Sequence, residues 1–126
     1  MAKSKGQLEA EISEALIKFE KEYMGRGPEQ TKTHIIGDMV VVRLQRVLTP
    51  AEEQLARGAD QAEGRRLIKR VRIELLEKAR PLLERIIMDL TGKKVISLHT
   101  DISTITGERV VIFTLESLVA LPGDED

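Results

Sequence analysis

Hydrophobic residues recur at intervals of three and four over residues 7–24, which predicts an amphipathic helix. The stripe that we expect to face the core consists of Leu8, Ile12, Ala15, Leu16, Phe19 and Tyr23. The next four residues read Gly-Arg-Gly-Pro. Glycine favours the position just past a helix end and proline cannot continue a helix, so we expect this helix to end near Gly25.

The interval between apolar residues then changes to two, which predicts strands over residues 31–36 and 39–47. Gly37 and Asp38 lie between these strands and suit a two-residue turn of type I′ or II′. The face of the second strand that we expect to point into the core consists of Val40, Val42 and Leu44. Its other face is interrupted by an arginine and a glutamine.

A second helix is expected from residue 50 onward. Thr49 can cap it, Pro50 suits its first position, and Glu52 completes a capping box. Gly58 predicts the end of this helix. Residues 58–64 are small and polar, and they form either a connection or a weak place in a longer helix.

The strongest helical pattern of the chain covers residues 65–90. Pro81 lies inside it and predicts a kink or a break near residues 78–80, because proline lacks the backbone N–H and clashes with the preceding turn. A helix of about 26 residues is about 39 Å long, which is more than a sheet of short strands needs. We therefore expect the overhang and its wide apolar stripe to pack against a second chain in a homodimer.

Two further strands are predicted over residues 94–103 and 109–115, with a turn at Gly107 and Glu108. Strict alternation along the first of them places Ile96, Leu98, Thr100 and Ile102 on one face. The order helix–strand–strand thus occurs twice, and the two turns are 70 residues apart. An internal duplication and a chance likeness of two valine-rich hairpins both account for this.

The order of elements predicts an α+β fold. Two helix–strand–strand units are expected to form a mostly antiparallel four-stranded sheet, with helices packed on one face and one of them long. The length of 126 residues fits a single domain over 1–126. We expect its core at about 7–118, with a flexible short N-terminal tail and a flexible acidic C-terminal tail.

Composition excludes several classes of protein. With 41% hydrophobic and 33% charged residues the chain is neither disordered nor membrane-spanning, and it begins without the apolar block of a signal peptide. We therefore expect a cytoplasmic protein. The absence of cysteine excludes disulfides and thiol catalysis, and two histidines leave little for metal binding, so we predict no metal and no cofactor.

Two groups of basic and polar residues are candidates for binding. Around the first hairpin they are Arg26, Lys32, Thr33, His34 and Arg43, which suit a small anion such as bicarbonate, phosphate or a nucleotide. On the long helix they are Arg65, Arg66, Lys69 and Arg70. The second group, with Arg72 on the same side as Arg65 and Lys69, either binds phosphates or an anionic membrane surface or forms a solvated helix face.

Other functions find less support in the residues. The net charge is −1 and the aromatic residues total three, so nucleic-acid binding through the basic helix is a minor alternative. His99 and Asp101 share one face of a predicted strand, a spacing that can orient an imidazole. No nucleophile motif accompanies them, and we do not expect an enzyme.

Four segments of the chain resemble a bacterial family called YbcI-like or MpsC-like. They are the run of residues 25–44, which begins Gly-Arg-Gly-Pro-Glu-Gln-Thr-Lys, then Leu-Thr-Pro-Ala-Glu-Glu from Leu48, Gly-Arg-Arg from Gly64 and Leu-Thr-Gly-Lys-Lys-Val from Leu90. The resemblance extends from about Lys5 to Leu118, and the G-x-G-P-x-x-T-K block is its most specific part.

MpsC-type proteins are named for a sodium-translocating system that generates a membrane potential, and related systems are linked to inorganic-carbon uptake. The resemblance therefore implies a non-catalytic, cytoplasmic accessory or regulatory protein of such a transport system. A sensor module for a small anion or nucleotide is the alternative. The resemblance supplies no catalytic residues.

Overall fold

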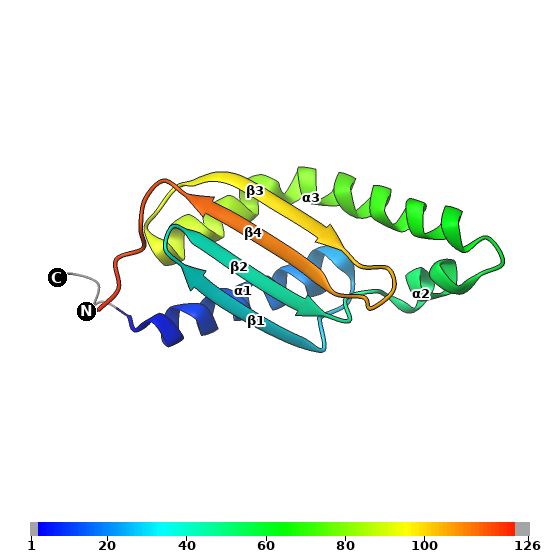
Figure 1. The fold of residues 1–126 in the computed structure, drawn as a ribbon, viewed down its shortest axis with the longest axis horizontal. Helices are drawn as coiled ribbons and strands as arrows, with labels where there is room; N and C mark the ends of the chain where they lie inside the picture. The colour runs from blue at the N-terminus through cyan, green and yellow to red at the C-terminus, as the bar shows by residue number, and fades with distance from the viewer. Residues whose placement is uncertain (1–2, 123–126) are drawn as a thin grey trace.

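Two helices cross one face of a four-stranded antiparallel sheet in the computed structural model of the chain, which describes residues 3–122 (Figure 1). The elements in chain order are α1 (Lys5–Met24), β1 (Gln30–Ile36), β2 (Met39–Gln45), α2 (Pro50–Arg57), α3 (Gln61–Thr91), β3 (Val95–Ile102) and β4 (Arg109–Leu115). The predicted α+β fold with helices on one face and one long helix is confirmed. Of the predicted flexible tails, residues 1–2 and 123–126 lie outside the described residues.

The sheet joins two hairpins through their second strands, in the order β1-β2-β4-β3. The predicted core face of β2 is confirmed, because Val40, Val42 and Leu44 are fully buried. Gly37 has a φ of 61°, as the predicted two-residue turn requires. The second hairpin differs from the expectation. Residues 103–108 form its longer loop, in which the N–H of Gly107 donates to the carbonyl oxygen of Ser103.

The sequence likeness between the hairpins does not extend to their orientation. A shift of 70 residues aligns Val40 with Val110, yet the first is fully buried and the second is half-buried on the opposite face of the sheet. Because a register change by one residue turns every side chain to the other face, the two strands are not equivalent at this shift. Chance likeness of two valine-rich hairpins is the better explanation.

A β-bulge near the start of β3 changes the expected alternation there. The pairing register with β4 shifts between Val95 and Ser97. As a result Val95 is buried and Ile96 is exposed, although strict alternation places Ile96 on the same face as the buried Ile102. Beyond the bulge, Leu98, Thr100 and Ile102 share the core side, because they pair in register with buried residues of β4.

Side-chain caps define where the helices begin. Thr49 and Glu52 form the predicted capping box of α2, with both reciprocal hydrogen bonds present. Ser4 and Gln7 form a second box at α1. Gly25, in the left-handed conformation, ends α1 where the sequence predicts.

Helix α3 is longer and more regular than expected. It begins at Gln61, leaving residues 58–60 as the connection to α2, and it continues through Pro81 for 31 residues. Of the predicted kink or break at residues 78–80, the break is therefore wrong. Pro81 has no backbone N–H, so the carbonyl oxygen of Glu77 lacks its usual helical hydrogen bond. Both residues lie on the exposed side of the helix, where water can replace this bond.

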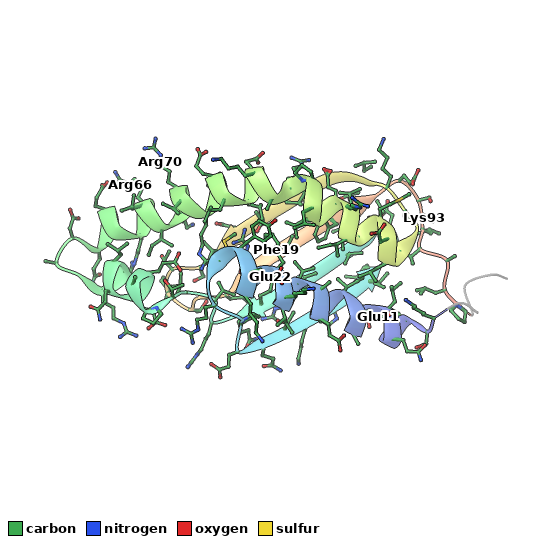
Figure 2. All side chains as sticks on the ribbon, turned by 180° about the vertical axis from the view of Figure 1, so that it is seen from behind. Glu11, Phe19, Glu22, Arg66, Arg70 and Lys93 are labelled. Atoms are coloured by element: carbon green, nitrogen blue, oxygen red, sulfur yellow. The ribbon has the colours of Figure 1, made fainter. Side chains whose placement is uncertain are left out.

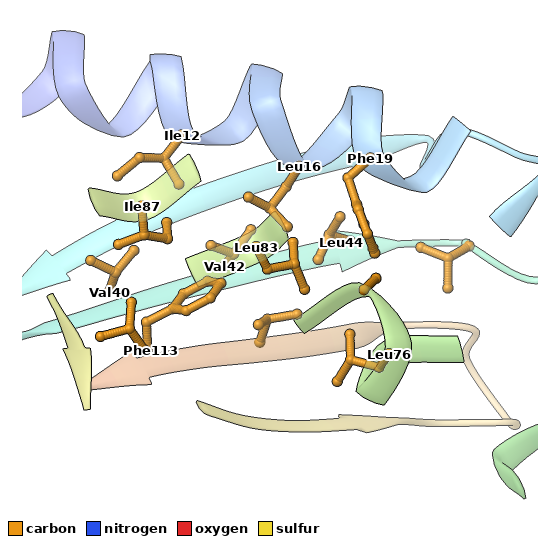
Figure 3. Packing of buried hydrophobic residues seen from close by; sticks show 14 of the residues in the cluster. Ile12, Leu16, Phe19, Val40, Val42, Leu44, Leu76, Leu83, Ile87 and Phe113 are labelled. Carbon is orange, nitrogen blue, oxygen red and sulfur yellow. The ribbon is translucent and has the colours of Figure 1, made fainter. Parts of the chain in front are cut away.

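The core lies between the helix layer and the sheet (Figure 3). Its largest fully buried hydrophobic side chains come from α1, α3, β2 and β4, and they include Ile12, Leu16, Leu83, Ile87, Leu44 and Phe113. Val119 and Leu121 are buried as well, so the core extends beyond the predicted limit at residue 118. The opposite face of the sheet is not covered by any helix of the described residues (Figure 1).

The first half of α3 projects with α2 beyond the end of the sheet (Figure 1). Gly64 makes this contact possible, because a Cβ atom there would lie 1.9 Å from the carbonyl oxygen of Leu55. The projecting α2–α3 pair and the loops at this end of the sheet surround the cavity described next.

Candidate functional site

An open cavity of about 340 Å³ lies at the end of the sheet beside the α2–α3 pair. Segments far apart in the sequence form its wall, among them the loop after α1, the end of β2 and the loop between β3 and β4. The lining residues are Arg26, Arg46, Leu48, Glu53, Ala56, Arg57, Arg65 and 104–107. Its volume falls in the range of about 300–1,000 Å³ that is usual for ligand pockets.

Arg26 belongs to the loop that turns away from α1 at Gly25. Its Nη1 donates a hydrogen bond of 2.7 Å to the carbonyl oxygen of Leu48. The same nitrogen lies 3.5 Å from a carboxylate oxygen of Glu53. These contacts hold the half-buried guanidinium against the cavity wall, although the ion pair itself is partly exposed and contributes little to stability.

Arg46 follows β2 directly and has a φ of 56°, in the left-handed region that residues other than glycine seldom adopt. Backbone hydrogen bonds on both sides hold this conformation. The N–H of Glu29 donates to the carbonyl oxygen of Gln45, and the N–H of Val47 donates to that of Gly107. Such local strain is concentrated at functional sites, and here it places a guanidinium at the cavity.

Arg57 and Arg65 come from the two helices of the α2–α3 pair. Arg57 is the last residue of α2 and is exposed, whereas Arg65 lies in the second turn of α3 and is half-buried. The Nε of Arg65 is buried and has no hydrogen-bond partner within residues 3–122. A buried donor without an acceptor raises the free energy of the folded chain, and a bound anion would remove that cost.

The residues that line the cavity carry a net positive charge, although Arg46 also lies 3.3 Å from the carboxylate of Glu29, outside the lining. Four arginines face one glutamate, which leaves a net charge of +3 on the lining residues. A guanidinium presents a planar fork of donors that fits two oxygens of a phosphate or a carboxylate. The hydroxyl groups of Thr104 and Thr106 add neutral polar groups to the wall. This donor set suits a small anion with several oxygens.

A buried ionic cluster joins the elements that carry the cavity. Arg72 of α3 donates to both carboxylate oxygens of Glu52 at 2.8 and 2.7 Å, and to the carbonyl oxygen of Val47 at 3.0 Å. The carboxylate of Glu20 in α1 lies 3.5 Å from Arg72 and 4.0 Å from Arg109. Glu20, Arg72 and Arg109 are at most 3% exposed.

The two carboxylates of this cluster have pKa values shifted in opposite directions. Burial raises the pKa of Glu20, and the opposing charges of Arg109 and Arg72 only partly offset this effect. Burial also acts to raise the pKa of Glu52, but hydrogen bonds from Arg72 and Thr49 outweigh it and lower the pKa. Glu52 is therefore the anchored anion of the cluster.

The structure separates the first predicted group of binding residues. Arg26 lines the cavity, whereas Lys32, His34 and Arg43 lie on the uncovered face of the sheet, where Lys32 pairs in register with Arg43. Thr33 points the other way and is buried, with its hydroxyl 2.7 Å from that of Ser13.

The second predicted group is also divided. Arg65 faces the cavity, whereas Arg66 pairs with Glu63 and Lys69 pairs with Asp101. Arg66 and Arg70 extend outward from α3, away from the sheet (Figure 2). Arg72 does not belong to an accessible basic face as expected, because it is buried against Glu52.

His99 and Asp101 lie on the uncovered face of the sheet and are exposed. Asp101 lies 3.3 Å from Lys69, and its Oδ1 accepts the N–H of Ile102. No hydrogen bond joins the two side chains in the part of the chain that the structure describes. Nor does that part bring together three side chains that could hold a metal ion.

Sequence reasoning missed Arg46, Arg57 and the loop of residues 104–107. Arg57 could have been predicted, because it ends a capped helix just before Gly58, next to the segment that carries Arg65. Arg46 could not have been predicted, since its position at the cavity depends on a left-handed backbone conformation that no pattern in the sequence indicates.

These features define a two-layer α+β fold with an arginine-lined cavity at one end of its sheet. None of the helices within residues 3–122 is long and apolar enough to cross a membrane. The chain belongs to the MpsC family, described as "Na+-translocating membrane potential-generating system (MpsC)", which matches residues 4–117. The resemblance drawn from the sequence is thereby confirmed.

A relative in Bacillus subtilis (strain 168), "Uncharacterized protein YbcI", is 47% identical over 115 residues. The match covers 91% of this chain and 90% of the relative. No solved structure matches the chain.

Proposed function

We propose that this protein is a non-catalytic accessory or regulatory protein of a bacterial membrane ion or inorganic-carbon transport system, and that it binds a small anion in the arginine-lined cavity. The observation that carries the proposal is the convergence of Arg26, Arg46, Arg57 and Arg65 on one cavity with a single carboxylate. The ligand class is a small oxyanion: bicarbonate, inorganic phosphate or the phosphates of a nucleotide.

The form of the cavity supports a regulatory site. Its wall joins the α2–α3 pair to the loops of the sheet, so a bound anion would bridge segments that are far apart in the sequence. A ligand that binds the folded chain also stabilises it. We infer that a bound anion orders the α2–α3 end of the protein, and that a partner responds to this ordering and hence to the anion concentration.

The family description supports the choice of partner. It refers to a system that translocates Na⁺ and generates a membrane potential. Since such transport needs a component within the membrane, we propose that this protein acts beside that component, as a cytoplasmic homodimer.

Isothermal titration calorimetry with inorganic phosphate, bicarbonate and ATP tests the anion site. We expect one of them to bind, and we expect Arg57→Ala and Arg65→Ala each to weaken binding about tenfold or more, because hydrogen bonds to charged groups contribute about 1.5–3 kcal/mol. Arg66→Ala is the matched control, since Arg66 pairs with Glu63 outside the cavity. No binding by any of the three, or equal loss in Arg66→Ala, would contradict the proposal.

Affinity purification of the tagged chain from its native host tests the accessory role. Mild detergent keeps membrane complexes intact, and mass spectrometry identifies what is recovered. A membrane-spanning subunit of a cation or inorganic-carbon transporter is expected. If repeated purification recovers no membrane-transport subunit, the accessory role is wrong, whatever the result for anion binding.

A further inference from the structure

The exposed side of α3 carries an apolar stripe that no described element covers. Leu67, Val71, Leu75 and Leu82 follow each other at helical spacing, and they are between 37% and 46% exposed. Isolated exposed hydrophobic residues are ordinary, but a continuous row of them marks an interaction surface. We call these four residues and Ile86 the α3 stripe.

Hollows lie at both ends of the α3 stripe. One, of about 280 Å³, is between α2 and α3 and is lined by Leu55, Gly64 and Leu67. The other, of about 320 Å³, lies between α1 and α3 and is lined by Leu82 and Ile86 together with Phe19 and Tyr23 of α1. Figure 2 shows this side of the molecule, with Phe19 and Glu22 on the turns of α1 beside α3.

Two opposite charges lie near the middle of the stripe, where Lys78 falls between Leu75 and Leu82 at helical spacing and Glu74 lies one turn before Lys78. Glu74 and Lys78 are both exposed, and neither takes part in an ion pair among the described residues, although five other charged residues of α3 do so at the helix surface. Their midpoint in the sequence is residue 76. The midpoint between Leu67 and Ile86, the ends of the stripe, falls within one residue of it.

This symmetry identifies the occupant. We propose that the α3 stripe binds the α3 stripe of a second copy of this chain in antiparallel orientation, with a two-fold axis passing near residue 76. Glu74 of each copy then faces Lys78 of the other, which gives two equivalent ion pairs. Leu67 of each copy reaches the hollow of the partner beside Ile86. A parallel arrangement would bring Glu74 against Glu74, and the repulsion between these carboxylates disfavours it.

The dimensions of the surface agree with such a dimer. Leu67 and Ile86 are about 29 Å apart along the helix at 1.5 Å per residue. The half of α3 that projects beyond the sheet is not covered by the sheet (Figure 1). Glu74 and Lys78 lie close to the proposed two-fold axis, where the two helices stay near each other at any crossing angle. The inference deepens the expected homodimer but uses no residue of the arginine cavity, so anion binding and dimerisation can fail separately.

The test is sedimentation velocity of the wild-type chain and of two charge-reversal variants, Glu74→Lys and Lys78→Glu. The sedimentation of the wild type should give a mass of twice the monomer mass of 14.1 kDa. Each variant alone places like charges across the axis twice, so its dimer dissociation constant should rise about tenfold. An equimolar mixture of the two variants restores both ion pairs and should regain wild-type affinity as a heterodimer.

Mixing isolates the contact between chains, because it leaves any charge effect within each helix unchanged. Circular dichroism of each variant verifies its fold. Val71→Ser should also weaken the dimer, whereas Ile96→Ser, on the exposed edge strand β3, should not. A monomeric wild type, variants that dimerise like the wild type, or a mixture no tighter than either variant would each overturn the proposal.

Discussion

Arg72 and Glu52 are 20 residues apart, and the guanidinium of Arg72 donates to both carboxylate oxygens of Glu52. Glu52 also accepts the backbone N–H of Thr49 and so completes the cap of α2. One carboxylate therefore both starts a helix and anchors a buried arginine. This pair ties α2 to α3 directly beneath the arginine-lined cavity.

Replacing Arg72 should strongly destabilise the protein. Arg72→Met fills a similar volume but removes the main partner of Glu52 and leaves Glu20 with Arg109 alone, and breaking a buried ion pair costs about 3–5 kcal/mol. Urea denaturation followed by circular dichroism measures the loss. The matched control is Arg66→Met, whose ion pair with Glu63 is exposed and should contribute less than about 1 kcal/mol. Equal losses in the two variants would refute a special role for the cluster.

The raised pKa of Glu20 predicts a dependence of stability on pH. The folded chain holds this proton more tightly than the unfolded chain, so the wild type loses stability as the pH rises from the ordinary glutamate pKa of about 4.3 through the folded pKa. Glu20→Gln has no such proton. The unfolding free energy of the variant minus that of the wild type should therefore increase over this pH range and then level off.

Denaturant titrations at closely spaced pH values measure this difference. Glu52→Gln provides the opposite case, because the lowered pKa of Glu52 contributes stability that is lost as the pH falls below about 4.3. A flat difference for Glu20→Gln would mean that Arg72 and Arg109 fully compensate its burial.

Arg46→Gly should separate stability from binding. Glycine adopts the φ of 56° without strain, so the folded state should gain up to about 1 kcal/mol, reduced by the greater entropy of the unfolded chain. The same change removes one of the four guanidinium groups of the cavity and should weaken phosphate binding. Thermal unfolding with and without phosphate measures both effects, and Arg46→Ala, which keeps the strain, is the control.

Gly64→Ala tests the close contact between α2 and α3. The new Cβ would lie 1.9 Å from the carbonyl oxygen of Leu55, a backbone atom that can move only with its helix. We expect a loss of about 1–3 kcal/mol from overpacking, together with weaker anion binding, because Arg57 and Arg65 would be moved apart. Gly6→Ala in α1 meets nothing within 4 Å and should be neutral or slightly stabilising. A neutral Gly64→Ala would show that the two helices need no close contact.

Local features of the fold were predictable because they depend on neighbouring residues. The capping box at Thr49, the turn at Gly37 and the end of α1 at Gly25 each involve side chains within about four positions. The break expected at Pro81 was wrong because that prediction ignored exposure. Water can satisfy a lost hydrogen bond on the outer side of a helix, and packing of the inner side keeps the helix continuous.

The candidate site was only half predictable. The sequence predicts Arg26 from the basic residues around the first hairpin and Arg65 from the basic run on the long helix. Nothing in the sequence distinguishes Arg65, which faces the cavity, from Arg66, which faces solvent. Arg72 was placed on the same basic face and proved to be buried. Its partners Glu20 and Glu52 lie 52 and 20 positions away, beyond the reach of any local pattern.

The amino-acid sequence by itself determined the type and approximate limits of the helices and strands and the family of the chain, because periodicity, caps and turns act over a few residues. Tertiary structure decided the strand order, which arginines are buried and which four meet in one cavity. Those outcomes depend on long-range packing, in which burial makes a charge costly unless a partner from another element reaches it. The α3 stripe was visible in the sequence as a pattern, but only the fold left it uncovered.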